Sequence, residues 1–250
     1  MAARAALIEI FDSIQGEGRF VGAPMAFLRV ATCPLRCSYC DTPHSYVAGP
    51  DFAVTLREGV RRAPNPIDAV GAAGWVRQSV ASPRRPHPVS VTGGEPLVYP
   101  QFLRELGEAL GPDHPLHLET AALDAKALGI VLPVLRHLSA DYKLPETVGG
   151  AHHGAAHVAC VAAALGHGAI SIDVKLVLTP SVATASFARA LADLAPFRAH
   201  VLLVLQPVTP FGVETRALPP DALTRFSHSA LAAGFEVRVL PQVHKVLAVP

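Results

Sequence analysis

Short apolar runs alternate with longer amphipathic stretches along most of this sequence. The runs have the length and the content of β-branched residues typical of buried strands, and lie at 24–30, 88–92, 116–120, 137–143, 170–178, 200–208 and 235–241. The segments between most of them are rich in Ala and Leu and have helical periodicity, at 67–80, 101–110, 157–168, 186–195 and 220–234. Strands that alternate with helices form parallel sheets, because a parallel connection needs a crossover. The pattern therefore predicts an α/β sheet or barrel, with residues 7–11 as an added edge strand.

Polar residues follow several of these runs at the point where each strand is expected to end. They are 92–96 (TGGEP), 119–120 (ET), 141–143 (DYK), Gln206 and 242–245 (QVHK). Ligands of parallel α/β folds bind at the carboxyl ends of the strands. The sequence therefore predicts one pocket formed by these residues.

Length and composition predict one globular domain over residues 1–250. Half of the 250 residues are hydrophobic and 16% are charged, which provides for a large core. The 21 basic and 20 acidic residues are scattered, with a net charge of +1, so the sequence lacks the basic stripe of a direct nucleic-acid binder. The N-terminus has no apolar core of signal-peptide length, and the strongest apolar run, 201–208, is too short to cross a membrane. We expect a cytoplasmic protein.

Three of the four cysteines lie within eight positions of one another in the stretch LRVATCPLRCSYCDTPHSY, and they are Cys33, Cys37 and Cys40. A structural zinc site needs four ligands, so zinc would have to recruit Cys160 or a histidine such as His44. An iron-sulfur cluster can be held by three thiolates with one iron left open to a ligand. The spacing thus favours a cluster, and Cys160, in an Ala- and Val-rich helical segment, is interpreted as a buried apolar residue.

The spacing CxxxCxxC resembles that of the radical S-adenosylmethionine enzymes. Further segments are similar to the 7-carboxy-7-deazaguanine synthases, namely 8–42, 89–97, 117–120, 139–145 and 241–245. The resemblance implies a partial (β/α) barrel that is open on one side. It also implies conversion of 6-carboxy-5,6,7,8-tetrahydropterin to 7-carboxy-7-deazaguanine with loss of ammonia, a lyase reaction that feeds queuosine or other deazapurine pathways.

The sequence departs from the pattern of that family at two places. Thr32 and Pro34 flank the first cysteine where the family usually has glycine and asparagine, and residues 119–122 read ETAA where the family often has ETNG. Every cysteine is retained, so the departures bear on local loop geometry and on cofactor contacts near Ala121.

The resemblance implies three cofactors: a 4Fe-4S cluster, S-adenosylmethionine and Mg²⁺. Cys33, Cys37 and Cys40 would hold the cluster, and Thr42 would bind Mg²⁺ together with substrate oxygens and waters. S-adenosylmethionine would contact the following residues: Tyr39, Gly93, Gly94, Glu95, Ser139, Ala140 and Asp141. Without the resemblance, TGGEP would be interpreted as a strand-to-helix turn and Thr42 as a loop or cap residue.

The resemblance also implies a set of substrate-binding residues. A carboxylate suits the adjacent N–H donors of a guanine-like edge, and a guanidinium can pair with a substrate carboxylate. The implied residues are Ile14, Gln15, Gly16, Glu17, Arg29, Thr92, His244 and, through the C-terminal carboxylate, Pro250. Taken alone, Arg29 would be interpreted as a salt-bridged or snorkelling strand residue.

We further expect an electron donor such as flavodoxin, a homodimer, and no membrane or direct nucleic-acid partner. Two rival interpretations are a glycyl-radical activating protein, which would act on a protein partner, and a zinc-stabilised binding module without catalysis. The run HHGAAH at 152–157 lacks the glutamate of a zinc-protease motif, so its histidines are interpreted as solvated.

Overall fold

The computed structural model describes residues 2–80, 86–168 and 170–250. Its strands are β1 (Arg4–Ala5), β2 (Leu7–Ile14), β3 (Pro24–Val30), β4 (Asp51–Leu56), β5 (Gly59–Pro64), β6 (Ile67–Asp68), β7 (Val89–Gly93), β8 (Leu116–Thr120), β9 (Leu135–Asp141), β10 (Ser171–Leu178), β11 (Leu202–Pro207) and β12 (Glu236–Val239). Its α-helices are α1 (Ala69–Ser79), α2 (Pro100–Leu110), α3 (Ala125–Val131), α4 (Gly154–His167), α5 (Thr184–Leu194), α6 (Pro220–Ala232) and α7 (Val243–Leu247). Short 3₁₀ turns include η1 (Gly18–Phe20), η2 (Pro43–Tyr46) and η3 (Pro96–Val98).

The main sheet has ten strands in the order β12-β11-β10-β9-β8-β7-β3-β2-β4-β5. Neighbouring strands from β3 to β12 are parallel, whereas β2 is antiparallel to β3 and β5 is antiparallel to β4. The two ends of the sheet, β12 and β5, do not pair with each other in the described structure. The sheet is therefore a partial barrel, and the predicted fold class is confirmed.

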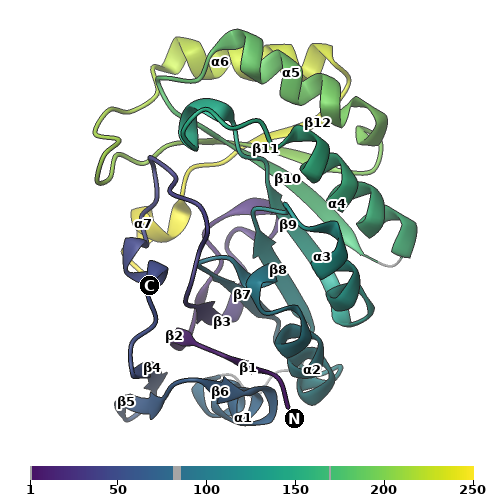
Figure 1. Ribbon diagram of the computed structural model, residues 1–250. Coiled ribbons are helices and arrows are strands. Elements are labelled where there is room, and N and C mark those ends of the chain that lie inside the picture. Colours follow the sequence, from purple (N-terminus) through teal and green to yellow (C-terminus); the bar gives the residue numbers. More distant parts are fainter. Residues whose placement is uncertain (1, 81–85, 169) are drawn as a thin grey trace.

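Helices α2 to α6 cover the outer face of the curved sheet, each in contact with the next (Figure 1). The amphipathic pattern explains this layer, because the buried positions of α2 recur at helical spacing, at Phe102, Leu103, Leu106 and Leu110. These side chains belong to one large core cluster that includes the outward-facing residues of the parallel strands. The helices thus cover only the outer face, and other segments of the chain cover the concave face of the sheet.

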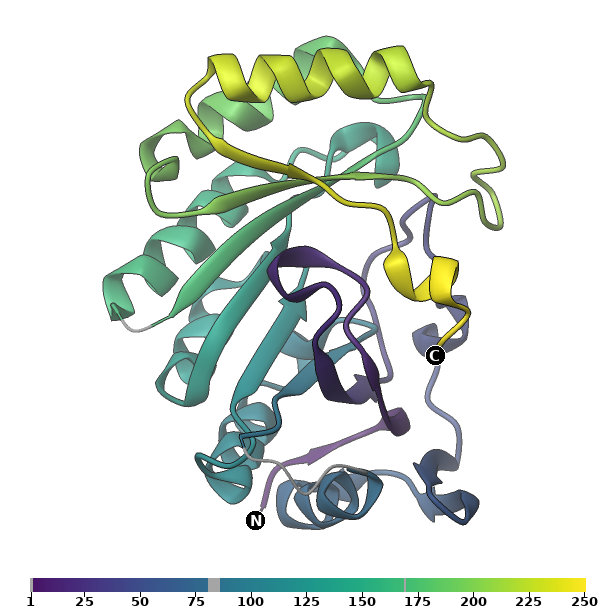
Figure 2. The same ribbon diagram turned by 180° about the vertical axis from the view of Figure 1, so that it is seen from behind.

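The concave face is covered by segments from the two ends of the chain. Figure 2 shows the β2–β3 hairpin on the open side of the sheet, and α7 lies beside it. The backbone N–H of Val243 donates to the carbonyl oxygen of Gly16 at 2.9 Å, and this bond connects the C-terminal segment to the loop that follows β2.

One prediction about the elements was wrong, and several elements were not predicted. Residues 7–11 belong to β2, which lies between β3 and β4 and is not an edge strand, because the unpredicted β4–β5 hairpin continues the sheet beyond it. Helices α3 and α7 were also not predicted. The Pro-rich stretch at 81–88 is predicted to be a loop, and 81–85 of it lie outside the described residues.

Among the helices of the described ranges, none combines the length and apolar character needed to cross a bilayer.

Candidate active site

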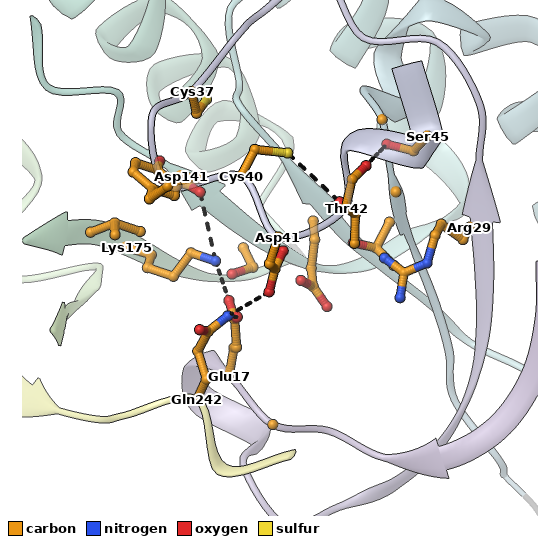
Figure 3. Close-up of a pocket in the computed structure, with 18 of the residues that line it drawn as sticks. Glu17, Arg29, Cys37, Cys40, Asp41, Thr42, Ser45, Asp141, Lys175 and Gln242 are labelled. Atoms are coloured by element: carbon orange, nitrogen blue, oxygen red, sulfur yellow. Dashed lines mark hydrogen bonds and ion pairs between the residues drawn. The ribbon is translucent and has the colours of Figure 1, made fainter. Parts of the chain in front are cut away.

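A cavity lies at the carboxyl ends of the parallel strands, where the sequence predicted a pocket. The three clustered cysteines lie in the loop of residues 31–42 that follows β3, here called the cluster loop. Figure 3 shows side chains from the cluster loop, the β2–β3 hairpin, the parallel strands and the C-terminal segment turned toward the cavity. The predicted site residues that line it are Ile14, Gln15, Gly16, Glu17, Arg29, Cys33, Cys37, Tyr39, Cys40, Thr42, Thr92, Gly93, Gly94, Glu95, Ser139, Asp141, His244 and Pro250.

Ala140 is the one predicted site residue whose side chain does not reach the cavity. It is 1% exposed and packs in the hydrophobic core under the helices. Successive residues of a strand point to opposite faces of the sheet, so Ser139 and Asp141 face the cavity while Ala140 faces away. A contact with a cofactor could involve only its backbone.

The three clustered cysteines are free thiols that line the same cavity. Burial raises the pKa of Cys33, and the nearby Glu95 and Cys37 raise it further. Burial also raises the pKa of Cys37, with Asp141 and Cys40 adding to the effect of burial and Lys143 opposing it. Thiolates at these positions therefore need a cation beside them, and an iron-sulfur cluster supplies positive charge of this kind.

The two glycines of TGGEP allow the turn to pack against the start of the cluster loop. A Cβ on Gly93, whose φ is +113°, would overlap the carbonyl oxygen of Val30, and a Cβ on Gly94 would overlap that of Thr32. Backbone bonds connect the same segments, from Gly94 N to Val30 O at 2.9 Å and from Glu95 N to Thr32 O at 2.8 Å. The close approach that requires glycine here is thus between two backbone segments of the protein itself.

We expect Gly94→Ala to separate this turn from the cluster loop. The added methyl group must push against backbone, so the free energy of unfolding should fall by about 1–3 kcal/mol, and less iron should bind on reconstitution. Gly129→Ala is the matched control, because Gly129 lies within α3 with open space where its Cβ would stand, and should stabilise by about 0.5–1 kcal/mol. Denaturant unfolding and iron analysis check both variants; unchanged stability of Gly94→Ala would contradict the packing role.

Thr32 has a positive φ of 76°, a conformation that strongly disfavours a β-branched residue. Its Oγ1 lies 3.2 Å from the Tyr99 hydroxyl, and its backbone N–H donates to Ser45 O at 2.7 Å. Ala122 also has a positive φ, of 49°. Thr32 and Ala122 each belong to one of the two departures from the family pattern. The backbone conformation at both positions favours glycine.

Glu95 is held by groups of the turn and of the β8 end. Its Oε1 accepts from the Thr120 hydroxyl and from Leu97 N, and its Oε2 accepts from Ala121 N at 2.8 Å. Burial raises the pKa of Glu95 in spite of these hydrogen bonds. Glu95 lines the cavity, and its Oε2 accepts only one of these bonds, so it can also accept from an ammonium group of a ligand.

Lys175 lies at the centre of a buried charge network. Its Nζ forms an ion pair with Glu17 and lies 3.6 Å from Asp141 Oδ2 (Figure 3). A second buried ammonium, that of Lys143, lies 2.7 Å from Asp141 and donates to the Tyr39 hydroxyl at 2.9 Å. Burial opposes ionisation of Glu17 and Asp141, but the lysines outweigh it and hold the pKa of both carboxyls below the usual range. The two carboxylates are therefore charged.

The C-terminal segment joins this network through Gln242 and Lys245. Gln242 Nε2 donates to Glu17 Oε1 at 2.7 Å and to Asp41 Oδ2 at 3.1 Å, and Lys245 forms an ion pair with Asp41 at 2.7 Å. Figure 3 shows the amide of Gln242 between the two carboxylates. Because Asp41 follows Cys40 directly, these contacts connect α7 to the cluster loop.

Glu119 is another carboxylate of the cavity, with surroundings opposite to those of Glu17. Its Oε1 accepts from Gln15 Nε2 at 2.9 Å and from Ser90 Oγ at 2.8 Å, and Ser90 in turn contacts His117 Nδ1 at 2.8 Å. Burial raises the pKa of Glu119, and the charge of Glu17 contributes to this increase while Lys175 opposes it. Glu119 thus takes up a proton more readily than Glu17.

Three other predicted residues have contacts that define how they are held. Arg29 donates from Nε to Glu9 at 2.7 Å, so it is salt-bridged and also lines the cavity. The Thr42 hydroxyl lies 3.9 Å from Cys40 Sγ, and the backbone carbonyl of Pro250 accepts from Ser13 Oγ at 3.0 Å. The C-terminus therefore lies at the edge of the cavity, where Pro250 is still exposed to solvent.

Sequence reasoning missed Lys175 and placed one histidine wrongly. Lys175 stands in β10, a largely apolar strand that also carries Asp173, and a charged residue in a strand expected to be buried was the signal for it. His157 is not solvated: it is 1% exposed, stacks on Tyr142 with ring centroids 4.4 Å apart and accepts from Lys143 N at 2.9 Å. The prediction that Cys160 is buried is confirmed.

Comparisons with known proteins agree with this geometry. No protein-family model matches the chain. A 7-carboxy-7-deazaguanine synthase of Geobacter sulfurreducens is 32% identical over 250 residues, and the match covers 97% of each chain. A 7-carboxy-7-deazaguanine synthase of Archaeoglobus fulgidus is 38% identical over 117 residues, and that match covers 47% of this chain and 46% of the other. The crystal structure of QueE from Escherichia coli matches with a TM-score of 0.60 at 19% identity, covering 94% of this chain and 93% of the other. A radical SAM methyltransferase from Sphaerobacter thermophilus matches with a TM-score of 0.56 at 15% identity, covering 87% of this chain and 66% of the other.

The partial parallel barrel, with three cysteines around the cavity at its carboxyl end, has the fold of the radical S-adenosylmethionine proteins. Within that class, the match to the Geobacter protein extends over nearly the whole of both chains. The chain belongs to the 7-carboxy-7-deazaguanine synthase family.

Proposed function

We propose that the protein converts 6-carboxy-5,6,7,8-tetrahydropterin to 7-carboxy-7-deazaguanine with loss of ammonia. One cavity brings together the three cysteines, the turn that carries Glu95, and the carboxylates of Glu17 and Glu119. This observation carries the proposal. Family membership supports the same reaction.

Cys33, Cys37 and Cys40 would hold a 4Fe-4S cluster, which together with S-adenosylmethionine supplies a 5′-deoxyadenosyl radical. In the described residues, no three Cys, His, Asp or Glu side chains converge on a point where a single metal ion could be held. A structural zinc site would need a fourth ligand beside the three cysteines, whereas a cluster can be held by three thiolates. Glu95, Ser139, Asp141 and Tyr39 would orient S-adenosylmethionine beside it, with the backbone of Gly93 and Gly94.

The chain's own groups would bind and orient the pterin. Glu17 is held negative by Lys175 and suits the adjacent N–H groups of the pterin edge, while Gln15, on the same loop, contacts Glu119. Arg29 is anchored through Nε, so its terminal nitrogens are oriented for the substrate carboxylate. Glu119, with its raised pKa, is suited to give or take a proton during loss of ammonia.

Thr42 would complete a Mg²⁺ site with oxygens of the substrate, since a single hydroxyl is too weak to hold the ion alone. Thr92 and His244, which both line the cavity, would also contact the substrate. We also expect an external one-electron donor such as flavodoxin, and a homodimer that light scattering would detect.

A C-terminal tag should weaken substrate binding, because the proposal places the carboxylate of Pro250 on the substrate. We expect the Michaelis constant for the pterin to rise by about tenfold or more, the effect of losing one charge-assisted hydrogen bond. The same tag at the N-terminus is the control, since that end lies away from α7 and the C-terminus (Figures 1 and 2). An unchanged Michaelis constant with the C-terminal tag would remove this contact from the proposal.

One anaerobic assay tests the function as a whole. Reconstituted protein is given a reductant, S-adenosylmethionine, Mg²⁺ and 6-carboxytetrahydropterin, and 7-carboxy-7-deazaguanine is measured by mass spectrometry. Formation of 5′-deoxyadenosine without the deazaguanine would contradict the substrate while leaving the radical chemistry intact. If cluster-loaded protein forms neither product, the proposed reaction is wrong.

A further inference from the structure

Four polar side chains form one row across the concave face of the sheet. The row follows the register of β7, β8, β9 and β10 and consists of Ser90, His117, His137 and Ser171. The first three are at most 4% exposed. Side chains two residues apart on a strand point to the same face, so Glu119 lies directly beyond His117, toward the carboxyl end of β8. The row is therefore the layer of side chains immediately below the cavity.

The row reaches Glu119 through the Ser90 hydroxyl. Ser90 Oγ donates to Glu119 Oε1 at 2.8 Å and lies 2.8 Å from His117 Nδ1. Because a hydroxyl has one hydrogen and Ser90 gives it to the carboxylate, the hydrogen of the second contact comes from His117 Nδ1. Burial and the neighbouring His137 lower the pKa of His117 to about 3, so the ring is neutral. His117 is thus a fixed donor and does not itself carry a transferred proton.

His117 is held in place by a second histidine and a phenylalanine. The rings of His117 and His137 are stacked, with centroids 4.7 Å and planes 3° apart, and the Phe20 ring meets both edge-on. His137 is fixed in turn by Asp173, 2.6 Å from its Nε2, and by Ser171, 2.7 Å from its Nδ1. Apolar side chains would fill a buried layer without the cost of pairing polar groups. A paired network of this kind instead fixes the orientation of the side chain at its end.

The hydrogen bonds to Glu119 converge on one of its two oxygens. Oε1 accepts from Ser90 and from Gln15 Nε2 at 2.9 Å, whereas Oε2 accepts no bond from any described residue. The Glu119 side chain is 18% exposed and lines the cavity, and Oε2 is not among the fully buried unpaired atoms of the described chain. The charged groups that face this carboxyl are Lys175 of β10 and Glu17 of the loop after β2. Oε2 is therefore the oxygen open to a bound molecule.

We propose that Ser90 and His117 are positioning residues for proton transfer by Glu119: they hold Oε1, so that Oε2 exchanges a proton with the bound substrate. The inference rests on the proposed function for the substrate, 6-carboxytetrahydropterin. One proton moves between Oε2 and the substrate, while the hydrogens of Ser90 and His117 stay in place. When Glu119 is ionised, the bonds to Oε1 stabilise its charge.

The first measurement is an infrared pH titration of the cluster-loaded protein without substrate. A protonated carboxyl has its own carbonyl band, and the part of that band that is absent from Glu119→Gln belongs to Glu119. Ser90→Ala removes a donor to the charged form, so the midpoint of the Glu119 band should rise by about 1 pH unit. An unchanged midpoint in Ser90→Ala would overturn the proposal. So would a wild type in which Glu119 gives no band at any pH at which the protein is folded.

Three further variants separate the hydrogen bonds from the packing of the layer. His117→Leu removes the donor to Ser90 and should raise the midpoint by about half a pH unit. His117→Asn keeps an N–H donor near the position of Nδ1 and should restore the wild-type midpoint. Ser171→Ala removes a hydroxyl from the other end of the row and should leave the midpoint unchanged. If His117→Asn behaves like His117→Leu, or if Ser171→Ala matches Ser90→Ala, packing is the cause and the proposal is overturned.

The second measurement is the pH dependence of deazaguanine formation. In Ser90→Ala the pH profile of kcat should move by the same amount as the infrared midpoint, and kcat at neutral pH should fall about tenfold or more. Neither Ser90 nor His117 is among the described residues that line the cavity, so the Michaelis constant for the pterin should change by less than about twofold. A shifted midpoint with an unchanged kcat profile would show that Glu119 does not transfer the proton, and would overturn the proposal.

The two measurements distinguish this inference from the proposed function. Absence of deazaguanine from the wild type would contradict the proposed function. The infrared titration needs no turnover, and it would still decide whether Ser90 and His117 hold Glu119.

Discussion

Replacing Cys37 by alanine should abolish product formation, with a loss of at least about 10³-fold, well beyond the 10–100-fold typical of changes outside the first ligand shell. Cys37 lines the cavity between Cys33 and Cys40, and with only two thiolates left the cluster has too few protein ligands. Iron and sulfide per chain should fall after anaerobic reconstitution, and formation of 5′-deoxyadenosine should fall with them. Mass spectrometry and iron analysis on the same samples check the result.

Cys160→Ala is the matched control for this variant. Cys160 is fully buried in α4 away from the cavity, and burial raises the pKa of its thiol to about 12, so it behaves as a small apolar residue. We expect normal iron content and activity with a modest loss of stability. If Cys37→Ala keeps its iron, or if Cys160→Ala loses it, the assignment of the cluster ligands is wrong.

Replacing Lys175 by methionine should destabilise the protein by about 3–5 kcal/mol, because it leaves buried carboxylates without their counter-ion. Lys175 is 7% exposed and pairs with Glu17, with Asp141 nearby. At about 2–4 °C per kcal/mol for a chain of this length, the melting temperature should fall by more than any surface substitution produces. Lys126→Met, an exposed lysine in α3, is the control and should change stability by less than about 0.5 kcal/mol.

A second substitution and the pH dependence distinguish lost charge from lost packing. Lys175→Met combined with Glu17→Gln should recover part of the stability, since Asp141 still has Lys143 as a partner. In the wild type, the pKa of Glu17 in the folded protein is below its usual 4.5. Its contribution to the free energy of unfolding is therefore present above pH 4.5 and is lost as the pH falls through the pKa of the folded protein. In Lys175→Met, burial dominates and raises the pKa of Glu17.

The stability deficit of Lys175→Met should therefore be largest at neutral pH and should shrink as the pH falls and the carboxyl takes up a proton. Denaturant unfolding from pH 4 to pH 7 measures this. A deficit that is independent of pH would show that the loss comes from packing alone.

The parallel part of the fold could be predicted because its strands are buried on both faces and read as continuous apolar runs. The runs at 24–30 and 116–120 coincide with β3 and β8. The β4–β5 hairpin was missed because only alternate residues of β4 are buried, at Phe52, Val54 and Leu56, and β5 is mostly exposed. Helix α7 has five residues, too few for propensity to specify, and its contacts with distant segments hold it.

The site was predictable where chemistry is local in sequence and not where it depends on distant pairing. The cysteine spacing and the TGGEP turn could be identified directly, but Lys175 and its partner Glu17 are 158 positions apart. Their contact exists only because the sheet brings the end of β10 beside the loop that follows β2. The glycines of the turn also allow it to approach Val30 and Thr32, and this contact between two backbone segments could not be predicted from the sequence.

The unpaired ends of the sheet, β12 and β5, leave one wall of the cavity to be made by the residue 15–20 loop and the C-terminal segment. Strands β8, β9 and β10 have a neighbour on each side, so their amide protons should exchange with solvent only when the whole protein unfolds. The amides of residues 243–249 are held by a few bonds and should exchange through local opening at far lower free energy. The molecule can thus admit its ligands from the side of α7 while the β8–β10 part of the sheet stays closed.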